Sequence, residues 1–139
     1  MKKALQEAEA ALEKGEVPIG AVIVIKDRII ARSHNLTEQL NDVTAHAEMQ
    51  AITAAANFLG GKYLKDCTLY VTLEPCKMCA GALYWSQISK IVYAAEDPQR
   101  GFGVMGSKLH PKTKITKGIL ANEASDLLKR FFIQKRNLN

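Results

Sequence analysis

The sequence lacks the paired cysteines of a disulfide framework, and it has no long apolar run. Three cysteines cannot all be paired, and two of them lie close together as Cys76 and Cys79, which favours a metal or redox role over structural bridges. Acidic residues interrupt the segment after Lys2 and Lys3, so it does not contain the apolar core of a signal peptide. No run reaches the roughly 18 apolar residues of a membrane span. We therefore expect a cytoplasmic protein without a membrane anchor.

Internal repeats, linkers and low-complexity segments are also missing. A length of 139 residues, 47% of them hydrophobic, with a formal net charge of +5, is typical of one folded domain over residues 1–139. The charge is unevenly distributed, because residues 108–139 hold eight bases and two acids, whereas residues 1–107 hold eleven bases and twelve acids. This excess predicts a polyanionic partner at the C-terminal end, with a solvated basic tail as the competing interpretation.

Hydrophobic periodicity and turn residues predict alternating helices and strands. We expect helices over 2–14, from Thr44 to a stop at Gly60-Gly61, from Glu74-Pro75 to about Gln87, and after Asn122. Strands are expected over 68–73 and 90–95, and a hairpin over 21–25 and 28–32 with Lys26-Asp27 as its turn. Residues 96–113, which contain several glycines and prolines, are expected to form a long functional loop. The predicted fold is one α/β domain with helices packed on a sheet.

Three side chains in the middle of the chain form a candidate metal site. Cys76 and Cys79 are three residues apart, so on a helix they share one face and both sulfurs can reach a single ion. His46, at the start of the preceding predicted helix, can supply a third ligand. Three protein ligands leave the fourth corner of a tetrahedral zinc to water, which is the arrangement of a catalytic site. The partial positive charge of the two helix N-termini would favour the thiolates and a hydroxide.

Glu48 is the candidate general acid and base beside this site. It lies two residues after His46, about 200° around a helix, and is therefore badly placed as a second ligand from the same face. A carboxylate next to the bound water can instead take a proton from it and pass that proton to a leaving group. Two alternatives stay open: a redox dithiol at Cys76 and Cys79, which would not explain His46 and Glu48, and a zinc-stabilised binding module, which would need a fourth ligand.

The combination of His46-Ala-Glu48 with Pro75-Cys-Lys-Met-Cys79 is the signature, H-x-E with P-C-x-x-C, of zinc nucleobase deaminases. Over nearly its whole length the sequence resembles the bacterial tRNA adenosine deaminase family, in segments 16–22, 44–49, 69–82 and 118–123 and in Phe131-Phe132. The resemblance implies a three-layer α-β-α sandwich with a mixed central sheet, like that of cytidine deaminases, and a homodimer. It also implies zinc-dependent hydrolytic conversion of the wobble adenosine of a tRNA anticodon to inosine.

The same resemblance implies residue roles, position by position. One zinc ion per chain would be bound by the residues already singled out, His46, Cys76 and Cys79. Glu48 would be the proton shuttle. Four residues would hold the substrate: Asn35 at the flipped base, Asp97 near the nucleotide backbone, and Ala47 and Pro75 beside them.

The C-terminal helix carries the expected RNA contacts. Consecutive Phe131 and Phe132 cannot both face inward, so one of them is expected to stack on a base or to cover the pocket. The candidate RNA-binding residues are Lys129, Arg130, Phe132, Lys135 and Arg136. On another helix, one face turned away from both cysteines is a candidate dimer interface, formed by Met78, Ala82 and Trp85.

The segment Gly101–Pro111 departs from the family, whose members carry a longer stretch with a Ser-Leu-Met run. This departure slightly favours an alternative function, deamination of a free base or nucleoside such as guanine or cytosine. Such an enzyme would share every zinc-site residue, so the metal motif cannot separate the two functions. The basic C-terminal third favours tRNA, because a small neutral substrate does not need a surface that binds phosphates.

Overall fold

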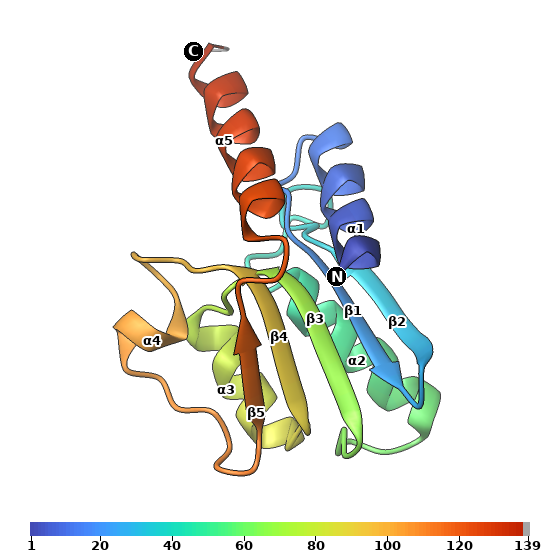
Figure 1. Cartoon of the computed structure of the whole chain (residues 1–139). Helices are drawn as coiled ribbons and strands as arrows, with labels where there is room; N and C mark the ends of the chain where they lie inside the picture. Colours follow the sequence, from blue (N-terminus) through green and yellow to red (C-terminus); the bar gives the residue numbers. More distant parts are fainter. Residues whose placement is uncertain (138–139) are drawn as a thin grey trace.

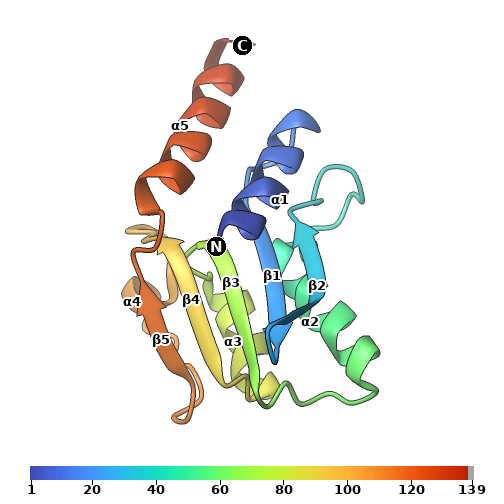
Figure 2. The ribbon, with the colours of Figure 1, turned by 45° about the vertical axis from the view of Figure 1, so that its right-hand side comes forward.

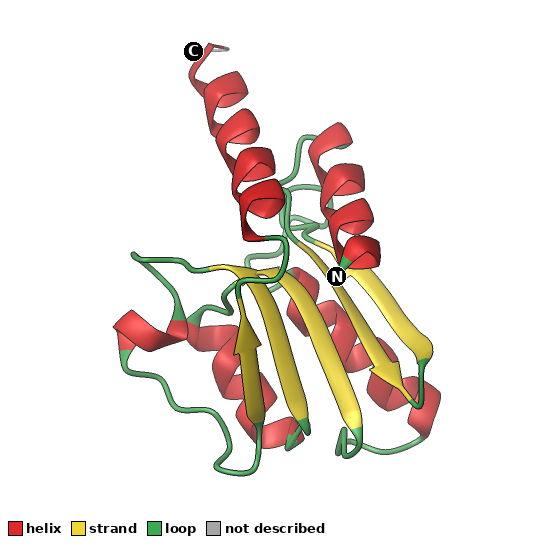
Figure 3. Ribbon diagram, in the orientation of Figure 1, coloured by secondary structure: helices red, strands yellow, loops and turns green. Residues whose placement is uncertain are grey.

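The computed structural model describes residues 1–137. Figure 1 shows the strands side by side in one sheet with the helices around it, and Figure 3 distinguishes helices from strands by colour. Along the chain the elements are α1 (Lys2–Glu13), β1 (Gly20–Ile25), β2 (Arg28–His34), α2 (Ala47–Leu59), β3 (Cys67–Leu73), α3 (Lys77–Ser86), β4 (Lys90–Ala95), α4 (Phe102–Met105), β5 (Lys114–Lys117) and α5 (Ala121–Asn137).

The five strands of the described chain form one mixed sheet in the order β2-β1-β3-β4-β5. β1 is antiparallel to β2 and to β3, whereas β3, β4 and β5 are parallel to one another. The β1–β2 hairpin turns at Lys26 and Asp27, whose φ angles of 48° and 62° suit the left-handed backbone of a type I′ turn. The hairpin predicted from the sequence is therefore confirmed.

Helices cover both faces of the sheet and give the molecule three layers. α2 and α3 lie behind the sheet in Figure 1, and α1 and α5 lie on the opposite side (Figure 2). On α2 the fully buried Ala51 and Ala55 belong to the larger apolar core, and their small side chains allow the helix to approach the sheet closely. On the other face Ala124 of α5 packs with Ala94 and Ala95 of β4. The predicted α/β sandwich with a mixed sheet is confirmed.

The strand directions bring several chain segments to one end of the sheet. β2, β3, β4 and β5 end there, and β1, which is antiparallel to β3, begins there. Asn35 follows β2, Cys76 comes shortly after β3, and Asp97 comes shortly after β4. The crevice outside the carboxyl ends of strands is the usual ligand site of α/β sheets. The topology thus gathers residues far apart in sequence where a ligand is expected.

Two helices begin later than the sequence predicts. α2 begins at Ala47 rather than Thr44, and its N-cap is His46 with an extended ψ of 155°. α3 begins at Lys77 rather than at Glu74-Pro75, and its N-cap is Cys76 with ψ of 175°. Each of these two side chains therefore leaves the chain just before the first helical turn. The predicted glycine stop of α2 is confirmed, since Gly60 has the left-handed φ of 71°.

The predicted loop over 96–113 was wrong in part, because it contains the short helix α4, and the strand β5 follows where none was expected. The four residues of β5 include two lysines and are mostly exposed, so they show neither an apolar run nor alternation. Parallel pairing with the edge of β4, with Lys114 opposite Lys90, makes them a strand.

α5 differs from its prediction in detail. It begins at Ala121, so Asn122 lies inside the helix rather than at its N-cap. Phe131 is buried and Phe132 is 53% exposed, as expected for consecutive helical residues. Among the helices of residues 1–137, none combines the length and the apolar character that crossing a membrane requires.

Candidate active site

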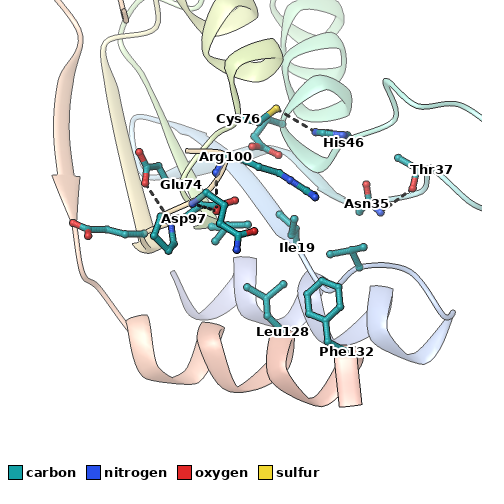
Figure 4. Close-up of a pocket in the computed structure, with 16 residues that line it drawn as sticks. Ile19, Asn35, Thr37, His46, Glu74, Cys76, Asp97, Arg100, Leu128 and Phe132 are labelled. Atoms are coloured by element: carbon teal, nitrogen blue, oxygen red, sulfur yellow. Dashed lines mark hydrogen bonds between the residues drawn. The ribbon is translucent and has the colours of Figure 1, made fainter. Parts of the chain in front are cut away.

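A cavity of about 510 Å³ opens at the end of the sheet where the strands converge. Figure 4 shows it surrounded by side chains from the segments after β2, β3 and β4, with α5 closing it from the side opposite His46 and Cys76. The residues that line it are Val17, Ile19, Asn35, Thr37, His46, Glu48, Leu73, Glu74, Cys76, Glu96, Asp97, Pro98, Gln99, Arg100, Leu128 and Phe132. Residues from three separate parts of the chain, 17–48, 73–100 and 128–132, therefore meet around the cavity.

His46, Cys76 and Cys79 lie together, and the first two of them line this cavity. The Nδ1 atom of His46 is 3.6 Å from the sulfur of Cys76 and 3.5 Å from that of Cys79. The three candidate ligand atoms all lie within 4.8 Å of one another. His46 and Cys76 are helix N-caps, and Cys79 lies in the first turn of α3, so two helix N-termini meet at the cluster. The grouping predicted from the sequence is thus present in the tertiary structure.

These separations fit a zinc ion. Zinc binds sulfur at about 2.3 Å and imidazole nitrogen at about 2.0–2.1 Å, and tetrahedral angles then separate the two donor atoms by roughly 3.6 Å. The two nitrogen–sulfur distances, 3.6 and 3.5 Å, agree with that value. Two soft sulfur ligands and one imidazole favour zinc over calcium or magnesium, which prefer oxygen. The residues present can therefore hold one zinc ion while leaving a coordination position open.

The pKa values of the Cys76 and Cys79 thiols are shifted in opposite directions. A hydrogen bond from Cys79 is the largest cause that lowers the pKa of Cys76, to about 3, and a hydrogen bond donated by His46 lowers it further. The same Cys76–Cys79 hydrogen bond, followed by burial, raises the pKa of Cys79 far above its usual range. The hydrogen bond to Cys76 raises the pKa of His46. A divalent cation bound here would replace the protons that His46, Cys76 and Cys79 share in hydrogen bonds, since thiolates and neutral imidazole are the forms that bind metal.

Glu48 lies beside the cluster in the first turn of α2 and is only 4% exposed. Burial is the largest cause that raises its pKa, to about 7. The carboxylate does not belong to the group of candidate ligands, which agrees with the role predicted for it. The helical angle of 200° used to exclude Glu48 as a ligand does not apply, however. His46 is the N-cap and precedes the helix, so a rotation about the helix axis does not relate it to Glu48.

Asn35 and Asp97 lie on opposite walls of the cavity (Figure 4). The amide nitrogen of Asn35 donates to Glu16 Oε1 at 3.4 Å and to Thr37 Oγ1 at 3.2 Å. The Oδ1 atom of Asp97 accepts hydrogen bonds from the backbone N–H groups of Gln99 and Arg100, at 3.1 and 3.0 Å. Both side chains are therefore fixed by local bonds while they line the cavity.

Glu74 fixes the loop that begins at Asp97 and forms one wall of the cavity. Its buried carboxylate accepts hydrogen bonds from the backbone N–H groups of Asp97 and Gly103, both at 3.0 Å. The loop passes so close to this carboxylate that a Cβ atom at Gly101 would lie 2.3 Å from Glu74 Cδ. Phe102 N also donates to Pro75 O at 2.9 Å. A side chain at position 101 would therefore displace the Glu74 carboxylate from its hydrogen bonds, which favours glycine there. These hydrogen bonds also fix the start of the segment that departs from the family.

Not every predicted site residue reaches the cavity. Ala47 and Pro75 are buried next to the ligand cluster in the chain and do not line the cavity, so the structure does not support direct substrate contacts for them. Phe132 lines it, whereas the exposed Lys129, Arg130, Lys135 and Arg136 are outside its lining.

Sequence reasoning missed several lining residues, among them Thr37, Glu74, Arg100 and Leu128. Glu74 could have been singled out, because an acid directly before Pro-Cys is unusual at the end of a buried strand. No local signal marks Thr37 or Leu128, since only the tertiary contacts bring them to the cavity.

Comparison with known proteins identifies the family. The family model of the MafB19-like deaminases matches residues 1–139. The tRNA-specific adenosine deaminase of Aquifex aeolicus is 46% identical over 142 residues, which cover 99% of this chain and 94% of that protein. The enzyme of the same name from Bacillus subtilis is 45% identical over 142 residues, covering 98% of this chain and 88% of that protein.

Solved structures agree with this relation. One from work on A-to-I editing by tRNA:A34 deaminases at the wobble position of transfer RNA superposes with a TM-score of 0.84 and 43% identity, covering 92% of this chain and 97% of that chain. A guanine deaminase from Bacillus subtilis superposes with a TM-score of 0.65 and 45% identity, covering 68% of this chain and 61% of that chain. The first superposition confirms the cytidine deaminase-like fold that the sequence predicts. Relatives that are all named tRNA-specific adenosine deaminase match this chain almost from end to end, and the chain therefore belongs to the bacterial tRNA-specific adenosine deaminase family.

Proposed function

We propose that this chain, acting as one deaminase domain, hydrolyses the wobble adenosine of a tRNA anticodon to inosine and ammonia. The observation that carries the proposal is the cavity that joins Glu48 and the His46–Cys76–Cys79 cluster to Asn35 and Asp97. The full-length relation to enzymes named tRNA-specific adenosine deaminase supports tRNA as the substrate. A tRNA substrate also agrees with the cytoplasmic location expected from the sequence.

One zinc ion per chain is assigned to His46, Cys76 and Cys79. Zinc bound there supplies a Lewis acid that lowers the pKa of a water molecule toward about 7. The chain's contribution to the chemistry is made by Glu48, whose carboxylate accepts a proton from the attacking water and returns it to the leaving amino group. Burial raises the pKa of this carboxyl, which favours a group that both takes up and returns a proton. Glu48 lines the cavity and is only 4% exposed, so few bulk water molecules can compete for that proton.

The cavity walls hold the extruded nucleotide. Asn35 would hydrogen-bond the base, and Asp97, on the opposite wall in Figure 4, would contact the nucleotide backbone. Phe132 and Leu128 of α5 supply an apolar side against which a base or ribose can pack. An adenosine lifted out of an anticodon loop is already single-stranded, so extrusion costs less than it would in a duplex.

The substrate test compares RNA with free bases. The enzyme is incubated separately with an anticodon stem-loop that carries a wobble adenosine, with guanine and with cytosine, and inosine and released ammonia are followed. A second stem-loop, with the adenosine moved one position along the loop, is the control. We expect inosine from the first stem-loop alone. A higher kcat/KM for guanine or cytosine than for the stem-loop would refute the proposal and establish the alternative that the sequence left open.

The basic end of α5 is the proposed RNA-binding surface. The helix extends past the rest of the molecule in Figures 1 and 2, and Lys129, Arg130, Lys135 and Arg136 are exposed on it. Replacing all four with glutamine should weaken stem-loop binding and flatten the dependence of log Kd on log salt by up to about 3, since each phosphate contact of a single strand contributes roughly 0.7. Fluorescence anisotropy over a salt series measures both effects.

A matched control replaces four exposed lysines at the opposite end of the sheet, Lys26, Lys62, Lys65 and Lys112. This variant loses the same charge but should keep most of the affinity and the salt slope. If both quadruple variants behave alike, only net charge matters and α5 is merely a solvated basic face.

We also propose a homodimer that covers the face formed by Met78, Ala82 and Trp85. Trp85 is 76% exposed on α3, and Met78 and Ala82 are partly exposed, so together they offer an apolar face of the kind that partners cover. The chain has a mass of 15.3 kDa. Sedimentation equilibrium should give twice that mass for the wild type, and Trp85→Ala should shift the distribution toward the monomer. Ile133→Ala, which removes an exposed apolar side chain from α5, is the control and should leave the dimer intact.

A further inference from the structure

Glu16 is a buried carboxylate without a direct part in the proposed reaction. It lies in the connection between α1 and β1 and is 1% exposed. Within residues 1–137 it forms no ion pair. Burying an acidic side chain without a cationic partner is unfavourable unless hydrogen-bond donors satisfy its oxygens. The donors that surround Glu16 therefore indicate its role.

All three donors to Glu16 belong to the segment after β2. The backbone N–H of Gln39 donates to Oε2 at 2.7 Å, and the backbone N–H of Glu38 donates to Oε1 at 3.1 Å. The side-chain amide of Asn35 also donates to Oε1, at 3.4 Å. One carboxylate thus anchors both ends of residues 35–39, the segment that forms one wall of the cavity.

The chemistry of these contacts fixes the orientation of Asn35. An ionised carboxylate only accepts hydrogen bonds, so the amide of Asn35 must turn its nitrogen toward Glu16. The same nitrogen donates to Thr37 Oγ1 at 3.2 Å. Both amide hydrogens are then engaged by the protein, and the carbonyl oxygen of Asn35 is the atom left to face the cavity. In Figure 4 the bond to Thr37 marks the nitrogen end of this side chain.

We propose that Glu16 is a positioning residue that acts on the substrate through Asn35, by holding the amide so that its oxygen accepts a hydrogen bond from the nucleotide. The inference rests on the proposed function for the role of Asn35. Glu16 itself does not line the cavity, and its main effect is transmitted by the hydrogen bond that the Asn35 amide donates to it. The bonds from the backbone N–H groups of Glu38 and Gln39 hold the same segment in place.

Glu16→Gln tests the proposal, because it keeps the volume but exchanges one acceptor for a donor. A neutral amide cannot satisfy three donors, and its own nitrogen can donate to Asn35 and turn that amide over. Kinetics on the stem-loop are measured for Glu16→Gln, for Asn35→Ala and for the double variant, with zinc content and Tm for each. Glu13→Gln, which neutralises an exposed acid at the end of α1, is the matched control.

We expect kcat/KM to fall roughly tenfold in Glu16→Gln, mainly through KM, and roughly 10–100-fold in Asn35→Ala, with full zinc content in both. The double variant should lose less than the product of the two single effects, because the Asn35 amide that Glu16 orients is already absent. Effects that multiply in the double variant would overturn the proposal. If Glu16→Gln does not fold, Glu16→Asp keeps the charge, shortens the reach by one methylene and should show the same non-additivity at smaller size.

A second readout is independent of activity. In ¹⁵N-labelled protein the side-chain amide of Asn35 and the backbone amides of Glu38 and Gln39 should exchange hydrogen faster in Glu16→Gln than in the wild type. Unchanged exchange at Asn35 would overturn the proposal even if activity fell. If the wild type deaminates guanine or cytosine instead of the stem-loop, the proposed function fails, and the same double-variant comparison on that base decides the role of Glu16.

Discussion

Glu48→Ala should lower kcat by roughly 10²–10⁴-fold or more while the protein keeps its zinc and still binds the stem-loop. The carboxylate lies beside the ligand cluster but outside the group of candidate ligands, so removing it should abolish proton transfer without removing a metal bond. Single-turnover kinetics, metal analysis and stem-loop anisotropy measure the three quantities.

Glu48→Gln is the control for packing, because the residue is only 4% exposed and alanine would leave a cavity there. The amide keeps the shape but cannot move a proton, so it should be nearly as slow as alanine and closer to the wild type in Tm. Loss of zinc from either variant would make Glu48 a metal ligand. Retention of more than a tenth of wild-type kcat in both would exclude it as the proton shuttle.

Cys79→Ser should lose zinc and activity together. Cys79 is fully buried, and its sulfur is 3.5 Å from His46 Nδ1, the separation expected for two ligands of one tetrahedral ion. A serine hydroxyl is a poor replacement for a thiolate, because it is seldom deprotonated and binds zinc weakly. Metal analysis of the purified variant should find well under one zinc per chain, against about one in the wild type.

The matched control is Cys67→Ala. Cys67 is also fully buried but begins β3, away from the cluster, and burial raises the pKa of its thiol, as expected for an inert core cysteine. This variant should keep its zinc and its kcat, with a modest loss of Tm. A wild-type enzyme that stayed fully active after complete chelation would contradict the metal assignment altogether.

Local sequence patterns predicted most of the fold and the reacting groups. The Lys26-Asp27 turn, the runs of β1 to β4 and the glycine at Gly60 are short-range signals, because turn backbones and apolar runs depend on neighbouring residues. The spacing of Cys76 and Cys79 acts at the same short range. β5 has no such signal, since its four residues become a strand only through pairing with the edge of β4.

Only the tertiary structure decided which residues hold the walls of the cavity in place. The sequence by itself determined which residues are candidates for the chemistry, since the motifs around His46, Glu48, Cys76 and Cys79 are each local. It did not determine that Glu16 lies against Asn35, or that Glu74 lies under the loop that begins at Asp97. A buried carboxylate is stabilised by whichever N–H groups of backbone or side chain the fold brings to it, and the donors to Glu16 and Glu74 lie 19 to 29 residues away along the chain. Sequence spacing carries no information on contacts of that kind, because they exist only once the sheet has brought its strand ends together.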